Sequence, residues 1–171
     1  MVKHKIIPIP DASVGKVLGL VEVLYSYGGQ AKISFLSEEL HMPIDELGAA
    51  IDMAELFELL TVKDGTETLT LYGEAVSLGT IEDKKRILRK KISLIEPFKT
   101  AGALLRKKNG ASEDELFRKI TEKYPIQDRE RFHKLFVNWG TYVGLFEYDG
   151  QERTFKALQK SPASDIGGVI G

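Results

Sequence analysis

The sequence of 171 residues contains no cysteine and no long apolar run. Without cysteine, the chain has no disulfides, no thiolate catalysis and no zinc site built on thiolates. Its apolar runs fall well short of the roughly 18 residues that a membrane-crossing helix needs. The short basic opening is not followed by the apolar segment of a secretory signal. We therefore expect a cytoplasmic protein.

The common motifs of catalysis are absent as well. No Gly-x-x-x-x-Gly-Lys-Ser/Thr loop is present, so the chain has no ordinary ATPase site of its own. No Gly-x-Ser-x-Gly elbow is present either. The three histidines, His4, His41 and His133, are isolated in sequence and lack the spacing of metal ligands. We predict that the chain is not an enzyme and holds no cofactor or metal.

The charge that is present is unevenly distributed. Residues 1–79 contain 5 Lys or Arg and 12 Asp or Glu, whereas residues 80–108 contain 10 and 3. The remainder is nearly balanced, and the net charge of the chain is only −1. Charge blocks of this kind describe interaction surfaces and not the fold.

Two stretches, residues 44–71 and 128–158, share one pattern. In each, an amphipathic helix leads into a short apolar alternation and then an Asp-Gly pair, Asp64-Gly65 or Asp149-Gly150. Such a pair supplies the positive φ of a two-residue hairpin turn, after which a second strand returns. The first return strand would carry Leu69 and Leu71. The order helix, helix, helix, hairpin is typical of a winged-helix unit.

Further helices follow from caps and apolar spacing. Ser13 is the expected N-cap of a first helix, in which Gly15 and Gly19 suggest close packing of a neighbouring helix. Residues 81–95 form a long basic helix and residues 97–108 the next one. Ser112 and Glu115 predict a capping box. A later helix has one buried face at helical spacing, formed by Phe132, Leu135, Phe136, Trp139, Tyr142 and Val143.

These elements predict a mainly α fold with small β-hairpins (α+β), built as tandem winged-helix-like units joined by a long basic helix. The first unit with an N-terminal arm would occupy residues 1–79. Linker helices and the second unit would occupy 80–158. Residues 159–171, rich in glycine, would form a disordered tail.

The candidate interaction surface combines an acidic helix and a basic helix. The third helix of the first unit has no Lys or Arg and would repel a nucleic acid, whose binding depends on cations. The basic helix is a solvated outer face, a phosphate contact, or the partner of the acidic unit of a second copy in a homodimer. The surface comprises Asp45, Glu46, Asp52, Glu55, Glu58, Lys84, Lys85, Arg86, Arg89, Lys90 and Lys91.

Four blocks carry a family resemblance: residues 10–24 with Gly28-Gly29, Leu71-Tyr72-Gly73, Lys84-Lys85-Arg86, and residues 138–149 with their Trp-Gly-x-Tyr sequence. They resemble the C-terminal accessory (AAA-associated) domain of nitrate/sulfonate/taurine-type ABC transporter ATPases, over roughly residues 8–158. The resemblance implies a domain that regulates the ATP-binding cassette or mediates interactions, with no catalytic residues. The cassette itself is missing from this chain.

Three functional hypotheses follow. The favoured one is a non-enzymatic module that binds a protein partner, an ABC-type ATPase subunit. The alternative is a DNA-binding winged-helix transcriptional regulator that uses the basic helix. The third is a small-molecule sensor with its ligand between the two units, near Trp139.

Overall fold

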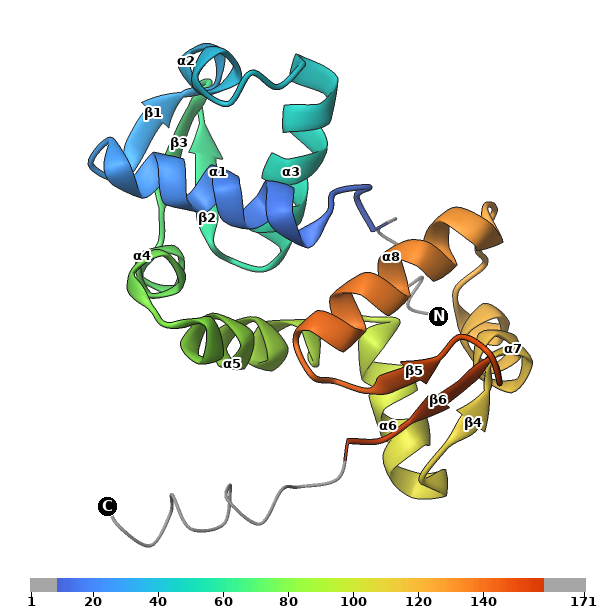
Figure 1. The fold of residues 1–171 in the computed structure, drawn as a ribbon. Coiled ribbons are helices and arrows are strands. Elements are labelled where there is room, and N and C mark those ends of the chain that lie inside the picture. Colours follow the sequence, from blue (N-terminus) through green and yellow to red (C-terminus); the bar gives the residue numbers. More distant parts are fainter. Residues whose placement is uncertain (1–8, 159–171) are drawn as a thin grey trace, which may run out of the picture.

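The computed structural model describes residues 9–158, which form eight helices and two small antiparallel sheets (Figure 1). This architecture confirms the predicted mainly helical α+β class with small hairpins. The first half contains α1 (Val14–Ser26), β1 (Gln30–Lys32), α2 (Ile33–Glu39), α3 (Ile44–Leu56), β2 (Leu60–Lys63) and β3 (Thr66–Leu69). Two helices follow, α4 (Leu71–Leu78) and α5 (Ile81–Ile92). The second half contains α6 (Phe98–Lys108), β4 (Ala111–Ser112), α7 (Glu113–Lys123), α8 (Arg129–Tyr142), β5 (Glu147–Asp149) and β6 (Thr154–Lys156).

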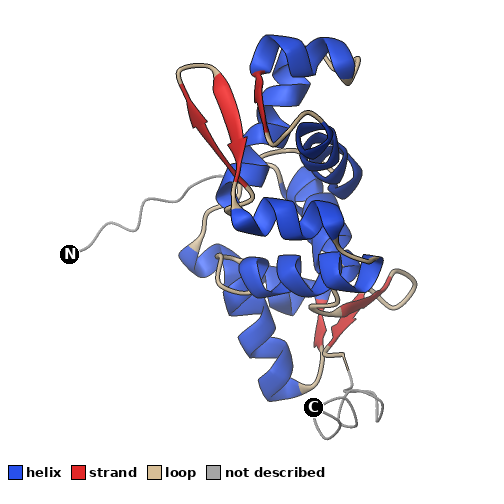
Figure 2. Cartoon of the chain, turned by 90° about the vertical axis from the view of Figure 1, so that its left-hand side faces the viewer, coloured by secondary structure: helices blue, strands red, loops and turns tan. Residues whose placement is uncertain are grey.

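The same order of elements recurs in the two halves. Each sheet places its last strand in the middle, in the orders β1-β3-β2 and β4-β6-β5. Figure 2 shows the strands of the two sheets as two separate groups among the helices. In the first sheet Ala31 lies opposite Glu67, and in the second Ala111 lies opposite Phe155. The shared register therefore relates the strand positions of the two halves, and Glu67 corresponds to Phe155.

The two hairpin turns differ. In the first, Asp64 and Gly65 both have positive φ, 51° and 73°, and they form the expected two-residue turn. In the second, Asp149 pairs with Thr154, so the connection has four residues and its positive φ belongs to Arg153. The expected two-residue turn at Asp149-Gly150 is therefore wrong. The Asp149 carboxylate accepts hydrogen bonds from the N–H groups of Gln151 and Glu152, and these bonds stabilise a longer turn.

Hydrogen bonds at the helix starts test the predicted caps. Ser13 caps α1 by accepting the N–H of Lys16 at 3.3 Å, as expected. Ser112 caps α7 in the same way, but the Glu115 carboxylate pairs with Lys108 and does not return to the cap, so the predicted capping box is only half correct. A complete capping box lies instead at the start of α5, between Thr80 and Asp83.

The two glycines of α1 are not explained by packing. A Cβ atom at Gly15 or Gly19 would meet no other atom within 4 Å, so the expected close approach of a helix is wrong. Close approach occurs elsewhere. A Cβ at Gly73 would overlap the carbonyl oxygen of Leu59, and one at Gly140 would overlap the ring of Phe146. Gly73 therefore allows α4 to pack closely against the backbone at Leu59, and Gly140 allows α8 to pack closely against Phe146.

The ends of some helices and strands also differ from those predicted. Leu71 does not extend the return strand; it is the first residue of α4 and is exposed. The basic helix α5 ends at Ile92, three residues before the predicted end. The predicted disordered tail and most of the predicted N-terminal arm lie outside the described residues.

Buried apolar side chains of both halves form one continuous cluster. Trp139 of α8 packs edge-on against Phe57 at the end of α3, with ring centroids 4.9 Å apart. The Trp139 Nε1 group donates a hydrogen bond of 2.9 Å to the carbonyl of Ala12, just before α1. The predicted apolar face of α8 is confirmed as core, because Leu135, Phe136, Trp139 and Val143 are all buried.

Candidate interaction surfaces

The solvent-facing side of α3 is acidic. Asp45, Asp52, Glu55 and Glu58 are exposed, and Glu46 is half-buried and pairs with Lys16 of α1. The opposite side of the helix is buried in the core, so the apolar spacing of α3 determines where the carboxylates point. No Lys or Arg occurs in α3. The structure thus gathers the five acidic candidates along one helix and its C-terminal end.

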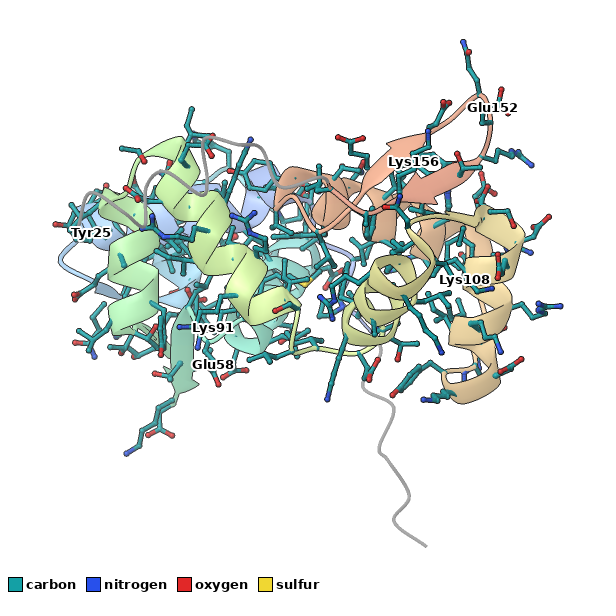
Figure 3. The ribbon with its side chains drawn as sticks, turned by 90° about the horizontal axis from the view of Figure 1, so that it is seen from below. Tyr25, Glu58, Lys91, Lys108, Glu152 and Lys156 are labelled. Carbon is teal, nitrogen blue, oxygen red and sulfur yellow. The ribbon has the colours of Figure 1, made fainter. Side chains whose placement is uncertain are left out.

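Two lysines of α5 are engaged by acidic residues of the first half. The Nζ atom of Lys84 lies 2.7 Å from Oε1 of Glu22 on α1. Lys91 pairs with Glu58 (Figure 3). The Nζ atom of Lys91 also lies 3.4 Å from the ring centroid of Tyr72. The hydrogen bond with Glu58 raises the pKa of Lys91. Part of the basic block therefore attaches α5 to the first half.

The other cations of α5 are more accessible. Arg86 pairs with Asp83 at 2.8 Å within the same helix, and Lys85 lies 5.5 Å from the ring centroid of Tyr142. Arg86, Arg89 and Lys90 are exposed. These three side chains are the part of the predicted basic surface that faces solvent most openly.

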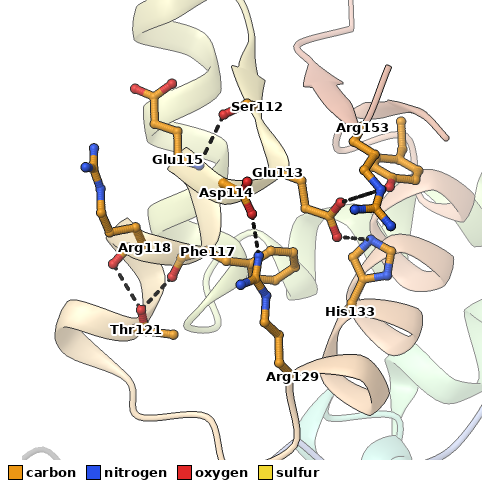
Figure 4. Close-up of polar contacts among 11 residues, drawn as sticks. Ser112, Glu113, Asp114, Glu115, Phe117, Arg118, Thr121, Arg129, His133 and Arg153 are labelled. Atoms are coloured by element: carbon orange, nitrogen blue, oxygen red, sulfur yellow. Dashed lines mark hydrogen bonds and ion pairs between the residues drawn. The ribbon is translucent and has the colours of Figure 1, made fainter. Parts of the chain in front are cut away.

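A polar cluster that the sequence did not reveal joins α7, α8 and the second sheet (Figure 4). Oε1 of Glu113 lies 2.8 Å from Nε2 of His133, and the contact is an ion pair only when the imidazole is protonated. Tyr148 donates to the other carboxylate oxygen at 3.3 Å, and Nε of Arg153 lies 3.9 Å from it. These residues are far apart in sequence, so their spacing carried no signal. The cluster cross-links α7, α8 and the second sheet.

Glu67 is the second feature that the sequence analysis missed. Its side chain is buried in the first sheet, and neither carboxylate oxygen has a hydrogen-bond partner among the described residues. Burial raises the pKa of this carboxyl to about 7. A signal existed, because the period of two along a strand places Glu67 on the same face as the buried Leu69.

Trp139 offers no surface to a ligand. Its side chain is fully buried, its N–H is satisfied by Ala12, and Phe57 packs against the ring.

Within residues 9–158, no helix is long and apolar enough to cross a membrane. In the same range, no three His, Asp or Glu side chains are grouped as metal ligands.

Comparison with known proteins gives one match. The model of the family described as the C-terminal AAA-associated domain matches residues 35–149, which run from α2 to the end of β5. No curated protein and no solved structure matches the chain. The family consists of accessory domains of ATPases and is not itself catalytic. The matched segment covers about two thirds of the sequence, and the chain belongs to the C-terminal AAA-associated domain family.

Proposed function

We propose that this chain is a non-catalytic module that binds an ATP-hydrolysing subunit of the ABC transporter type and regulates it. Family membership is the observation that carries the proposal. The sequence resemblance favours the nitrate/sulfonate group of transporters. The proposal places the chain in the cytoplasm, where ATP is available to such subunits.

We also propose that each half is a winged-helix unit, with α3 and α8 as the third helices and the hairpins as wings. The recurring order of elements supports this assignment. In a winged-helix protein that reads DNA, the third helix needs cations near phosphates. The carboxylates along α3 support a protein partner for the first half instead.

Self-association is less well supported than binding to a different protein. One of the alternatives for the basic helix was contact with acidic residues of a second copy. Lys84 and Lys91 instead pair with Glu22 and Glu58 of their own chain. This pairing supports a partner other than a second copy.

The test is binding of the full chain to the isolated ATP-binding subunit of a nitrate/sulfonate-type transporter from the same organism. We expect saturable binding and a changed rate of ATP hydrolysis by that subunit. Serum albumin and an ATP-binding subunit from an unrelated transporter serve as controls. Failure to bind, or ATP hydrolysis by the pure chain, would contradict the proposal.

DNA binding is the second candidate, because Arg86, Arg89 and Lys90 are exposed on one helix. The test is a titration with duplex DNA at low salt, repeated with these three residues changed to Glu. Lys84 and Lys91 stay unchanged, because their ion pairs hold α5 in place. Tight, salt-sensitive binding that the triple variant loses would establish this candidate over the first.

A further inference from the structure

Three large apolar side chains along α4 and the start of α5 are exposed. Leu71 is 82% exposed, Leu78 67% and Ile81 66%. Leu71 and Leu78 lie on one face of α4 with the exposed Ala75 between them, since positions i, i+4 and i+7 are neighbours on a helix. We call Leu71, Ala75, Leu78 and Ile81 the α4 ridge.

The opposite face of α4 is fixed to the rest of the chain. Gly73 and Val76 are buried, and Gly73 lies against the carbonyl of Leu59. The Ser77 hydroxyl donates to the carbonyl of Val21 in α1 at 3.2 Å. Figure 1 shows α4 at the edge of the molecule, between the first half and α5. The helix therefore cannot rotate to bury its ridge, and the exposed leucines contribute nothing to the core.

Both ends of α4 are also held rigidly. The Thr70 hydroxyl accepts the N–H of Gly73 at 3.1 Å and donates to the carbonyl of Glu58 at 2.5 Å. The capping box of Thr80 and Asp83 fixes the turn into α5. A ridge that is already ordered loses little conformational entropy on binding, so it is suited to docking.

The exposed charged side chains that directly adjoin the ridge residues in sequence are acidic. Glu74 is exposed on α4, and Glu82 is exposed directly after Ile81. α4 contains no Lys or Arg. Three lysines come near the ridge, but each is already engaged: Lys84 pairs with Glu22, Lys91 pairs with Glu58, and the half-buried Lys85 lies over the ring of Tyr142. A complementary surface would be apolar in the middle and would carry cations along its border.

A second copy of this chain does not meet that description. Pairing two α4 ridges about a two-fold axis would centre the axis near Ala75, because Leu71 of each copy would face Leu78 of the other. Glu74 is adjacent to that centre, so the two Glu74 side chains would be brought together. Like charges in this position destabilise an interface.

We propose that the α4 ridge docks into an apolar groove bordered by Lys or Arg on the ATP-hydrolysing partner. Leu71 and Leu78 would act as anchors of a helix in a groove, Ile81 at the start of α5 would add apolar contact, and Glu74 and Glu82 would pair with the cations of the border. This inference rests on the proposed function and identifies the surface that contacts the partner.

The first test is photo-crosslinking in cells that express the full chain. The photoreactive residue p-benzoylphenylalanine replaces Leu78 in one variant, Leu94 in a second and Glu55 of α3 in a third. Leu94 is the matched control, because it is 71% exposed and belongs to the connection between α5 and α6, which is not part of the ridge. We expect an adduct with an ATP-binding subunit from position 78 and none from position 94.

The other outcomes separate the two proposals. An adduct with the ATP-binding subunit from position 55 but not 78 would keep the proposed function and overturn the ridge. No such adduct from any position would overturn both. An adduct between two copies of the chain, or with a protein that is not an ATPase, from position 78 would overturn the choice of partner.

The second test measures the affinity for the same ATP-binding subunit. Changing both Leu71 and Leu78 to Ser should weaken binding at least about tenfold, as expected for anchor residues. Changing Leu94 to Ser removes a similarly exposed apolar side chain that is not part of the ridge and should leave affinity unchanged. Glu74→Lys should weaken binding and make it less sensitive to salt. Equal affinity of the wild type and the Leu71/Leu78 variant would overturn the inference.

Discussion

Gly73 and Gly140 occur in two of the sequence blocks that carry the family resemblance, and the structure gives a reason for both. Neither has room for a Cβ atom. We predict that Gly73→Ala and Gly140→Ala each lower the free energy of unfolding by about 1–3 kcal/mol, the usual cost of overpacking. Urea unfolding monitored by circular dichroism measures the change.

Gly15→Ala in α1 is the matched control for these variants. A Cβ there meets nothing, so removal of the helix-interior glycine should stabilise the protein by up to about 1 kcal/mol. Equal stabilities for Gly140→Ala and Gly15→Ala would show that the space around residue 140 is not restrictive.

Glu67 makes stability depend on pH. Its pKa in the folded chain is about 7, above the ordinary value of 4.5, so the unfolded chain loses this proton first as the pH rises. Ionisation therefore destabilises the fold between pH 4.5 and 7, by up to about 3 kcal/mol in total. We predict that Glu67→Leu raises the melting temperature, and more strongly at pH 8 than at pH 4.5.

The control for that variant is Glu152→Leu, which removes an exposed carboxylate from the second hairpin. A gain for Glu67→Leu that is the same at pH 4.5 and pH 8 would contradict ionisation as the cause. The corresponding residue of the second half is already apolar, Phe155, and supports the choice of an apolar replacement.

At the scale of elements, Thr70 connects the end of α3 to the start of α4. It caps α4 through Gly73 and also binds the Glu58 carbonyl. We predict that Thr70→Val, which keeps the shape but loses both hydrogen bonds, costs about 1–2 kcal/mol of stability, as for lost helix caps. Thr70→Ser keeps the hydroxyl and should cost clearly less. Thermal unfolding of the two variants distinguishes them, and equal losses would contradict the role of the hydroxyl.

Local sequence was sufficient for most elements and insufficient for their connections. Apolar spacing and the Ser13 cap placed α1, and the same spacing identified the buried face of α8. The second hairpin turn was predicted wrongly, because the hydrogen bonds of Asp149 and the pairing with Thr154 determine its length. The Glu113–His133 contact could not be predicted, since it depends on how α7 and α8 pack.

At the scale of the whole molecule, Trp139 links the two halves and is the only tryptophan. Because the core is continuous, we predict one cooperative unfolding transition, with coincident midpoints for tryptophan fluorescence and far-ultraviolet circular dichroism. Trp139→Phe removes the hydrogen bond to Ala12 and should lower the stability of the entire chain by about 1–3 kcal/mol. Two separate transitions in the wild type would show that the halves unfold independently.

The charge blocks illustrate what sequence can establish at this scale. The acidic and basic segments were evident from composition alone. Their pairing within one chain was not, because Lys84 and Glu22 are 62 positions apart and come together only when α4 packs against α1 and α5 packs against α4. The sequence therefore shows where the charges lie along the chain but not which of them are paired within it.

The hydrogen bond between Trp139 and the Ala12 carbonyl also has a consequence for biosynthesis. The hydrogen bond joins residues 127 positions apart, and the ring of Phe57 packs against the same indole. At about 5–20 residues per second, a ribosome needs roughly 4–16 s to make the roughly 80 residues between Phe57 and Trp139. During that interval the nascent first half exposes the apolar surface that Trp139 will cover. Cells that translate this chain slowly should therefore depend more on chaperones that shield nascent polypeptides.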